Sequence, residues 1–503
     1  MQGNSRTKNS IKNIMGGVFF RVVGIVYSFA IKTIIVWTLG KTYLGLNSLF
    51  SSIITVLSLS ELGIGTAMVY NMYKPVADEN YELLSALLNT YRKLYRIIGT
   101  VILSIGLVIL PFLKNFISGT YPKDINIYIL FLIYLLDTVL SYFLFAYKGA
   151  LLEAHQQNRI ENMIHSATNI LMYTGQIILL LITHNYYYYI IVAPICTLIL
   201  NLVRNRTVNR LYPNIVCEGK LEKEYLYSIF RKVKALIGHK LGTIIIVSAD
   251  SIVISSFLGL DVLGIYSNYY LIINSLIAFI TIFYTSITAS VGNSIVASNK
   301  STIEKNFKEL NFMNFWLVAW CTVCLFCLYQ PFMKIWMGKD MLFPNHMVIL
   351  FAIYFFCWLI RRIGLTYKDA GGLWEQDFWK PYVGAVINLI TNIILVKVIG
   401  VEGVLLSTIA VMVFIYFPWE TAVIFKCFFK KSPVSYLRKM FCYAMATVIA
   451  CSITYYISHL INDGGIAHLL LKAIICVIVP NCLFAILFLK TEEMKAVLDR
   501  IKK

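Results

Sequence analysis

Ionisable residues inside long apolar stretches are the first features of this 503-residue chain that could do chemistry. A charge in such surroundings is costly, so it usually faces a water-filled cavity or an opposite charge. Glu420 is one of these ionisable residues, provided that the apolar stretch around it is a membrane span. The basic members are Arg21, Lys32 and Lys240, and the other acidic members are Glu61, Asp137 and Asp250.

Two of these cations share one stretch and fall on one helix face. Arg21 and Lys32 are eleven positions apart, which on a helix places them about 20° apart around the axis and about 16 Å apart along it. A column of cations beside a cavity suits an anionic substrate such as a diphosphate. The alternatives are pairing with the buried acids, or a lysine that reaches the membrane surface from near a helix end. Glu61, Asp137 and Asp250 are candidates for ion or proton coupling, or for structural charge pairing.

The elements that carry these charges are membrane helices. The chain is 59% hydrophobic and only 14% charged, too apolar for a soluble protein of this length. Apolar blocks of about 20 residues in series predict an all-α polytopic membrane protein, because helices satisfy their own backbone polar groups in lipid. We predict fourteen spans, at 14–39, 44–72, 97–117, 125–147, 162–184, 187–208, 235–258, 263–290, 312–331, 345–365, 380–399, 402–425, 439–459 and 466–489.

The charges of the connecting loops predict the orientation of these spans. With the N-terminus inside, most of the 44 Lys and Arg fall in cytoplasmic segments, as the positive-inside rule requires. This alternation predicts an even number of spans with both termini in the cytoplasm. The net charge of +19 is therefore attributed to topology and to contact with anionic membrane lipids, and not to nucleic-acid binding.

A short internal repeat divides the predicted spans. Leu39-Gly40, Leu44-Gly45 and Ser48 recur as Leu258-Gly259, Leu263-Gly264 and Ser267 at a constant offset of 219, and the same register aligns Arg21 with Lys240. Transporters often descend from such duplications and handle substrate at the repeat interface. We predict an N-terminal lobe of six spans, a basic cytoplasmic linker, a C-terminal lobe of six spans, and two added spans with a cytoplasmic tail, at 1–208, 209–234, 235–425 and 426–503.

Sequence motifs of common enzymes and metal sites are missing. The chain has no P-loop, no His-Glu-x-x-His and no Gly-x-Ser-x-Gly. Cys321, Cys324 and Cys327 form a C-x2-C-x2-C run, but it lies in a continuous apolar segment, where small packing residues are the better interpretation. We therefore expect no metal, no cofactor and no enzymatic activity. A membrane glycan polymerase stays as an alternative, although such enzymes typically carry a large external loop.

Three stretches of the chain resemble a known family. They are Leu39-Gly40 through Leu59-Ser-Glu-Leu-Gly-Ile-Gly-Thr-Ala67 to Pro75; His239-Lys240 through Ala249-Asp250-Ser-Ile-Val-Ile254 to Gly259, Tyr266-Ser-Asn-Tyr269 and Val291-Gly-Asn293; and Asn388 through Val398-Ile-Gly400-Val-Glu-Gly403 to Ser407-Thr408. In these three stretches, the sequence resembles the Wzx-like flippases of polysaccharide repeat units. These belong to the MATE/oligosaccharidyl-lipid/polysaccharide exporter superfamily.

The resemblance implies a function. The substrate would be an undecaprenyl-diphosphate-linked oligosaccharide, moved across the bacterial cytoplasmic membrane by alternating access coupled to a proton or sodium ion. Basic residues of the first and seventh spans line the cavity of such flippases, and the matching positions here are Arg21, Lys32 and Lys240. Glycosyltransferases and a glycan polymerase would be the implied partners. A MATE-type exporter of organic cations is the alternative, although it would require a cavity with uncompensated acids.

Overall fold

A computed structural model describes residues 21–61, 63–462 and 464–501, and every regular element in this part of the chain is helical. The chain divides into two compact units, Met1–Asn268 and Tyr269–Lys503. The limits predicted for the two lobes and the linker stay a prediction. The helix α10 (Leu260–Ala297) begins in the first unit and continues into the second.

The first unit contains helices of very different lengths. A helix at Arg21–Thr38 precedes the labelled ones. The others are α2 (Lys41–Leu57), α3 (Ile64–Ala77), α4 (Tyr81–Ile109), α5 (Ile127–Phe143), α6 (Gly149–Ala154), α7 (Asn158–Thr183), α8 (Tyr186–Leu211) and α9 (Lys223–Leu258). The end of the predicted basic linker, 223–234, is thus helical and continuous with the seventh predicted span.

The second unit contains helices that are interrupted in places by tighter or wider turns. They are α11 (Lys300–Met337), α12 (Asn345–Ile360), α13 (Arg362–Ala370), α14 (Lys380–Ile399), α15 (Val401–Val411), α16 (Phe417–Val423), α17 (Val434–His459), α18 (Ile466–Phe488) and α19 (Glu492–Ile501). Two π-helical segments, Met412–Tyr416 and Ile424–Phe429, flank α16.

Eleven helices of the described residues are long and apolar enough to cross a membrane, or twelve if the bent pair Ile127–Phe143 and Ala146–Ala154 is one span. The chain is therefore a multi-pass membrane protein. Two predicted spans are not among these helices. The span 44–72 is divided between α2 and α3, and within 235–258 only the shorter apolar helix Ser248–Leu258 qualifies. The count of fourteen and the orientation of the spans stay predictions.

A break between α2 and α3 interrupts the predicted span 44–72. A 3-10 turn at Ser58–Glu61 follows α2, and Gly63 has the left-handed backbone angles φ 86° and ψ −16°. Glycine adopts this conformation without the steric cost that a side chain brings. An apolar pattern alone predicts one continuous helix here, and Gly63 is the sequence signal for the break.

The two turns of the predicted repeat have the same backbone conformation. Gly40 has φ 99° and ψ 174°, and Gly259 has φ 88° and ψ 173°. Each glycine ends one helix and begins the next. The turns are also joined by a side-chain hydrogen bond, because the Thr42 hydroxyl donates to Asp261 Oδ1 at 2.6 Å. Thr42 and Asp261 are equivalent positions of the repeat.

The same turns pack closely through a second pair of glycines, which we call the glycine contact (Gly45 and Gly264). A Cβ on Gly45 would lie 2.0 Å from the carbonyl oxygen of Leu260, and a Cβ on Gly264 would lie 2.3 Å from that of Lys41. In the repeat register Gly45 corresponds to Gly264, and Lys41 corresponds to Leu260. The contact is therefore reciprocal, as it is around a two-fold axis. Both positions need glycine because no Cβ fits.

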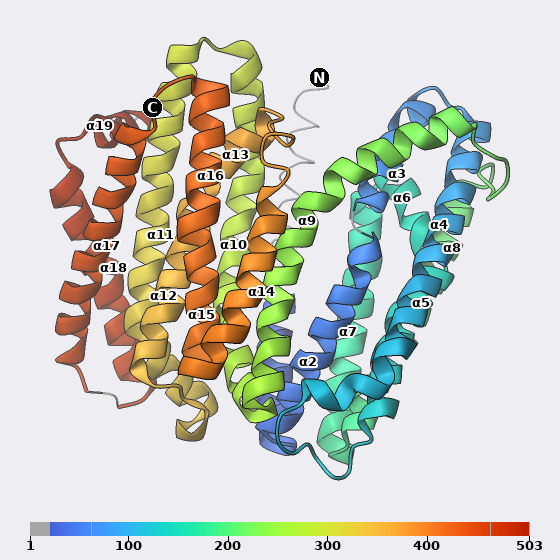
Figure 1. Cartoon of the computed structure of the whole chain (residues 1–503), viewed down its shortest axis with the longest axis horizontal. Coiled ribbons are helices and arrows are strands. Elements are labelled where there is room, and N and C mark those ends of the chain that lie inside the picture. The colour runs from blue at the N-terminus through green and yellow to red at the C-terminus, as the bar shows by residue number, and fades with distance from the viewer. Residues whose placement is uncertain (1–20, 62, 463, 502–503) are drawn as a thin grey trace. The chain divides into compact units, whose positions relative to one another are not determined.

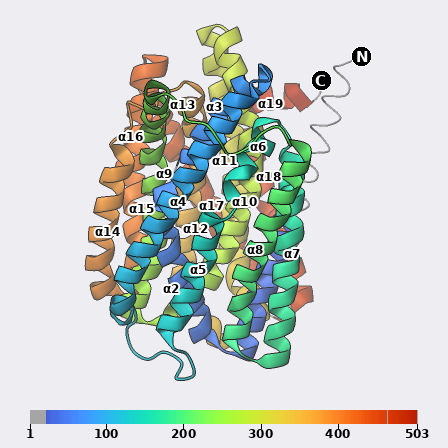
Figure 2. The same cartoon turned by 90° about the vertical axis from the view of Figure 1, so that its right-hand side faces the viewer.

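The helices of the first unit that matter for the site lie next to one another. Figure 2 shows α4, α5, α8 and α7 side by side, with α5 in contact with α4 and α8. α2 packs on both α5 and α9. The helix Arg21–Thr38, α2, α5, α7 and α8 line a cavity with polar side chains, described below.

The second unit is organised around α11, which packs against α12, α17 and α18 (Figure 1). Its core is rich in aromatic rings, and the rings of Phe315 and Tyr443 stack with centroids 4.1 Å apart. The indole of Trp316 donates to Asn481 Oδ1 at 2.6 Å. The two helices that the sequence predicts as an addition, α17 and α18, are thus attached through α11.

Candidate functional site

A cavity in the first unit brings together two of the predicted site residues, Lys32 and Asp137. Its volume is about 430 Å³, within the usual range for small-molecule sites. Lys32 comes from the helix Arg21–Thr38 and Asp137 from α5. Other polar side chains in the wall are Ser28, Asn47, Ser51, Thr55, Tyr134, Thr138, Tyr173, Gln176 and Tyr189.

Lys32 is held in the cavity wall by a backbone group. Its ammonium donates a hydrogen bond to the carbonyl oxygen of Ser267, near the start of α10, at 2.5 Å. Among the described residues, no carboxylate lies within ion-pair distance of this ammonium. An ammonium has three donors. Lys32 can therefore bind Ser267 and an anion in the cavity at the same time.

Asp137 is fixed by a neighbouring helix. The Thr197 hydroxyl of α8 donates to Asp137 Oδ1 at 2.6 Å. One turn earlier on α5, the Tyr134 hydroxyl donates to Asn47 Oδ1 at 2.6 Å and lies 2.9 Å from the Tyr186 hydroxyl. The carboxylate, amide and hydroxyl oxygens of this wall are the kinds of ligand that hard cations prefer. The cavity therefore has a group that can bind an anion, the Lys32 ammonium, and groups that can bind a cation, the oxygens around Asp137.

The other predicted site residues lie elsewhere. Arg21, the first described residue, is exposed and does not line the cavity. Lys240 lies on α9, but its side chain is outside those that the structure describes. Asp250 is also on α9 and is buried. The structure thus brings together Lys32 and Asp137, and whether Arg21 and Lys240 contribute to a common site stays a prediction.

Glu61 lies at the break between α2 and α3, and hydrogen bonds hold its carboxylate there. Its carboxylate accepts a hydrogen bond from the hydroxyl of Tyr142 at 2.6 Å and another from Tyr95. The Tyr95 hydroxyl in turn accepts from Tyr91 at 2.8 Å. These tyrosines come from α4 and α5. Glu61 therefore ties the broken segment to two neighbouring helices.

The second unit contains a buried ion-pair network that was not predicted from the sequence. Glu420 of α16 pairs with Arg361 at 2.5 Å and with Lys380 at 2.8 Å. Asp377 pairs with Lys380 and with Lys368, both at 2.8 Å. All five residues are buried. The sequence places Arg361, Lys368 and Lys380 among the cytoplasmic loop charges, and the acid Glu420 inside an apolar block was the only signal of the network.

Asp377 lies in the turn between α13 and α14. The network changes the pKa of its carboxyl group. Burial by itself raises the pKa of this carboxyl group, but the ammonium groups of Lys380 and Lys368 outweigh burial and lower the pKa below its ordinary value. Asp377 is therefore ionised at neutral pH. Its two lysines hold the ends of α13 and α14 together.

Comparison with solved structures gives the fold of the chain. It matches the lipid II flippase MurJ in an inward closed conformation with a TM-score of 0.63 at 16% identity, covering 94% of this chain and 98% of MurJ. It matches an inward-facing multidrug resistance MATE family transporter of the MOP superfamily with a TM-score of 0.61 at 14% identity, covering 79% and 94%. A MATE transporter of Vibrio cholerae matches with a TM-score of 0.54 at 12% identity, covering 83% and 97%.

These likenesses show that the chain has the polytopic helical fold of MATE transporters and MurJ. No protein-family model matches the sequence, and neither does any curated protein. The fold class predicted from the sequence is therefore confirmed at the level of a polytopic helical membrane fold, while the Wzx-like family remains a resemblance.

Proposed function

We propose that this protein is a flippase for undecaprenyl-diphosphate-linked oligosaccharides in the bacterial cytoplasmic membrane. It moves repeat units for surface polysaccharide from the cytoplasmic to the outer leaflet by alternating access, coupled to a proton or sodium gradient. Glycosyltransferases make the substrate and a polymerase consumes it. The fold shared with MurJ and the sequence resemblance to Wzx-like flippases support this proposal.

The observation that carries the proposal is the Lys32 ammonium in the wall of a polar cavity, bound to the Ser267 carbonyl. A diphosphate accepts charge-assisted hydrogen bonds, which are stronger than neutral ones. Arg21 and Lys240 are the further cations that would meet the diphosphate along its path. Asp137, in the same cavity, is the candidate group for ion coupling.

A MATE-type exporter of organic cations is the second candidate, and a specific observation favours it. Asp137 lines the cavity together with Tyr134, Tyr173 and Tyr189, and a carboxylate among aromatic rings suits an organic cation. The two functions predict different sensitive residues. A flippase depends on Lys32, whereas a cation exporter depends on Asp137 and tolerates the loss of Lys32.

The test is translocation of a labelled polyprenyl-diphosphate oligosaccharide in proteoliposomes, with an impermeant reagent that reports the outer leaflet. We expect Lys32→Ala to lower the rate about tenfold or more, because a charge-assisted hydrogen bond contributes about 1.5–3 kcal/mol. The matched control is Lys93→Ala, which removes an exposed lysine of α4. No lipid movement by the wild type, with export of an organic cation that Asp137→Asn abolishes, would instead establish the exporter.

A further inference from the structure

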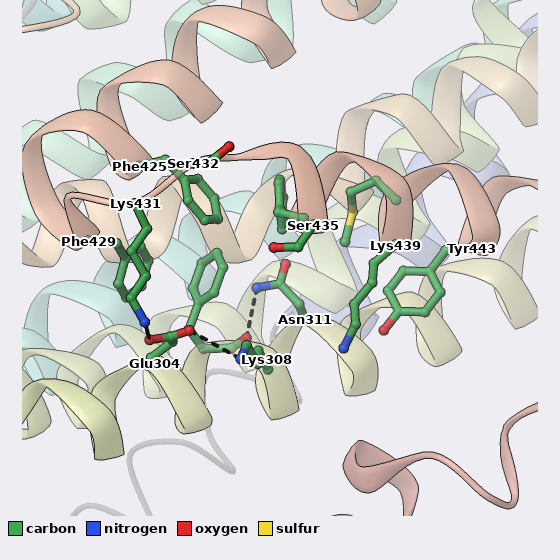
Figure 3. A pocket seen from close by; sticks show the side chains of 13 residues that line it. Glu304, Lys308, Asn311, Phe425, Phe429, Lys431, Ser432, Ser435, Lys439 and Tyr443 are labelled. Carbon is green, nitrogen blue, oxygen red and sulfur yellow. Dashed lines mark hydrogen bonds and ion pairs between the residues drawn. The ribbon is translucent and has the colours of Figure 1, made fainter.

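A pocket in the second unit lies where α11, the π-helical segment Ile424–Phe429 and α17 meet (Figure 3). Its volume is about 140 Å³. α11 and α17 both begin at this pocket and both are long enough to cross a membrane. The pocket is thus at the boundary between a membrane surface and two spans, on the side that the loop charges predict to be cytoplasmic.

The rim of the pocket carries three lysines from three segments: Lys308, Lys431 and Lys439. Lys308 lies 3.1 Å from Glu304 Oε1, and Lys431 pairs with the other oxygen of the same carboxylate. Figure 3 shows both ammonium groups converging on Glu304. All three lysine side chains are about half exposed. Lys439 pairs with Glu493. An ammonium has three donors, so each of these partly exposed lysines can bind a phosphate beside its carboxylate partner.

The floor of the pocket has an unpartnered polar atom. Asn311 is only 3% exposed, and its amide nitrogen donates to the Phe307 carbonyl at 2.8 Å. Its Oδ1 has no hydrogen-bond partner among the described residues. In Figure 3 the side chain extends from α11 toward Ser435 of α17. A buried acceptor of this kind is costly unless a donor reaches it, so the pocket suits a ligand that carries a hydroxyl group.

The walls of the pocket are aromatic and apolar. The rings of Phe307 and Phe429 lie 4.9 Å apart, and those of Phe425 and Tyr436 lie 5.2 Å apart. Met440 continues this surface along α17. A ligand with a charged, hydroxylated head and an apolar remainder matches the rim, the floor and the walls together.

We propose that this pocket binds an anionic phospholipid of the phosphatidylglycerol type from the adjacent leaflet. The lysines of the rim hold the phosphate and Asn311 accepts a hydrogen bond from the glycerol hydroxyl. Basic pockets between membrane helices are typical sites for anionic headgroups. The lipid bridges α11 and α17, and so stabilises the attachment of the two last spans. This lipid site requires only that the chain is a membrane protein, and it does not depend on the proposed flippase function.

The test is lipid binding to the purified full-length protein in detergent, measured by native mass spectrometry and by the shift of the melting temperature. We expect dioleoyl phosphatidylglycerol to bind saturably and to raise the melting temperature more than phosphatidylcholine with the same chains. The variant Lys308→Gln/Lys431→Gln/Lys439→Gln should bind it about tenfold or more weakly. The control Lys334→Gln/Lys339→Gln/Lys397→Gln makes the same charge change outside the pocket and should bind it like the wild type. Equal affinity of the pocket variant and the wild type would overturn the proposal.

Two further comparisons test the parts of the proposal separately. Phosphatidylmethanol has the same charge but no headgroup hydroxyl, so the wild type should bind it more weakly, and Asn311→Leu should remove this difference. If the wild type binds both lipids equally, the role of Asn311 is wrong even where the variant does not fold. Soluble glycerol phosphate should cause no shift, and a shift equal to that of the lipid would contradict a lipid site.

Discussion

At the scale of single residues, lysines withdrawn from solvent in the two units have different partners. Lys368 and Lys380 of the second unit pair with carboxylates, which identifies them as structural. The ammonium of Lys32 in the first unit donates to a backbone carbonyl beside a cavity. A lysine in an apolar segment that faces a cavity and has no paired acid is a candidate for binding an anionic ligand. This contrast is why we assign a binding role to Lys32 and not to the network.

Asp377 gives a prediction at the same scale. Asp377→Asn leaves two buried lysines with one fewer carboxylate, so we expect the free energy of unfolding to fall by about 3 kcal/mol or more. Asp369→Asn is the matched control, because Asp369 also contacts Lys368 but is about half exposed, and we expect it to change stability by less than about 1 kcal/mol. Denaturation of both variants in detergent, followed by circular dichroism, measures the difference.

The pH dependence of this effect follows from the lowered pKa of Asp377. A carboxyl group with a lowered folded-state pKa stabilises the fold above its unfolded-state pKa, and this stability is lost as the pH falls through the folded-state pKa. The difference in stability between wild type and Asp377→Asn should therefore be constant from pH 7 down to about 4 and shrink below that. A difference that disappears already near pH 6 would show that Asp377 is not the ionised centre of the network.

At the scale of elements, the glycine contact joins the N-terminal end of α2 to the N-terminal end of α10. Gly45→Ala and Gly264→Ala each place a methyl group against a backbone carbonyl, so we expect each to destabilise the protein by about 1–3 kcal/mol. Gly292→Ala on α10 is the control, since nothing lies within 4 Å of its Cβ position. Melting curves compare the three variants. Equal stability of Gly45→Ala and Gly292→Ala would mean that the close approach at the turns does not exist.

At the scale of the whole molecule, the loop charges predict the orientation of the chain in the membrane. We expect alkaline phosphatase to be active when fused within 118–126, between α4 and α5, and inactive when fused within 212–222, before α9. Green fluorescent protein fused after Lys503 should be fluorescent, since it folds in the cytoplasm. Phosphatase activity from the fusion within 212–222 would reverse the orientation and place the lipid pocket of the second unit in the other leaflet.

The sequence by itself determined the class of the protein and the positions of most of its membrane helices. Membrane helices are local features, because each must bury its own apolar side chains and satisfy its own backbone groups in lipid. The glycines of the repeat were visible for a similar reason, since a left-handed or tightly packed backbone position excludes other residues. The cation Lys32 and the acid Asp137 were each visible because a charge in an apolar block is costly.

Only the tertiary structure decided which of these residues meet. Lys32 and Asp137 share a cavity, whereas Glu61 lies among tyrosines at a helix break that the apolar pattern does not indicate. Asp377 belongs to a loop in the sequence but is fully buried between lysines of two helices, and Asn311 is an ordinary helix residue until α17 packs over it. Such contacts join segments that are far apart in the chain, and their energies depend on packing geometry that no local pattern contains.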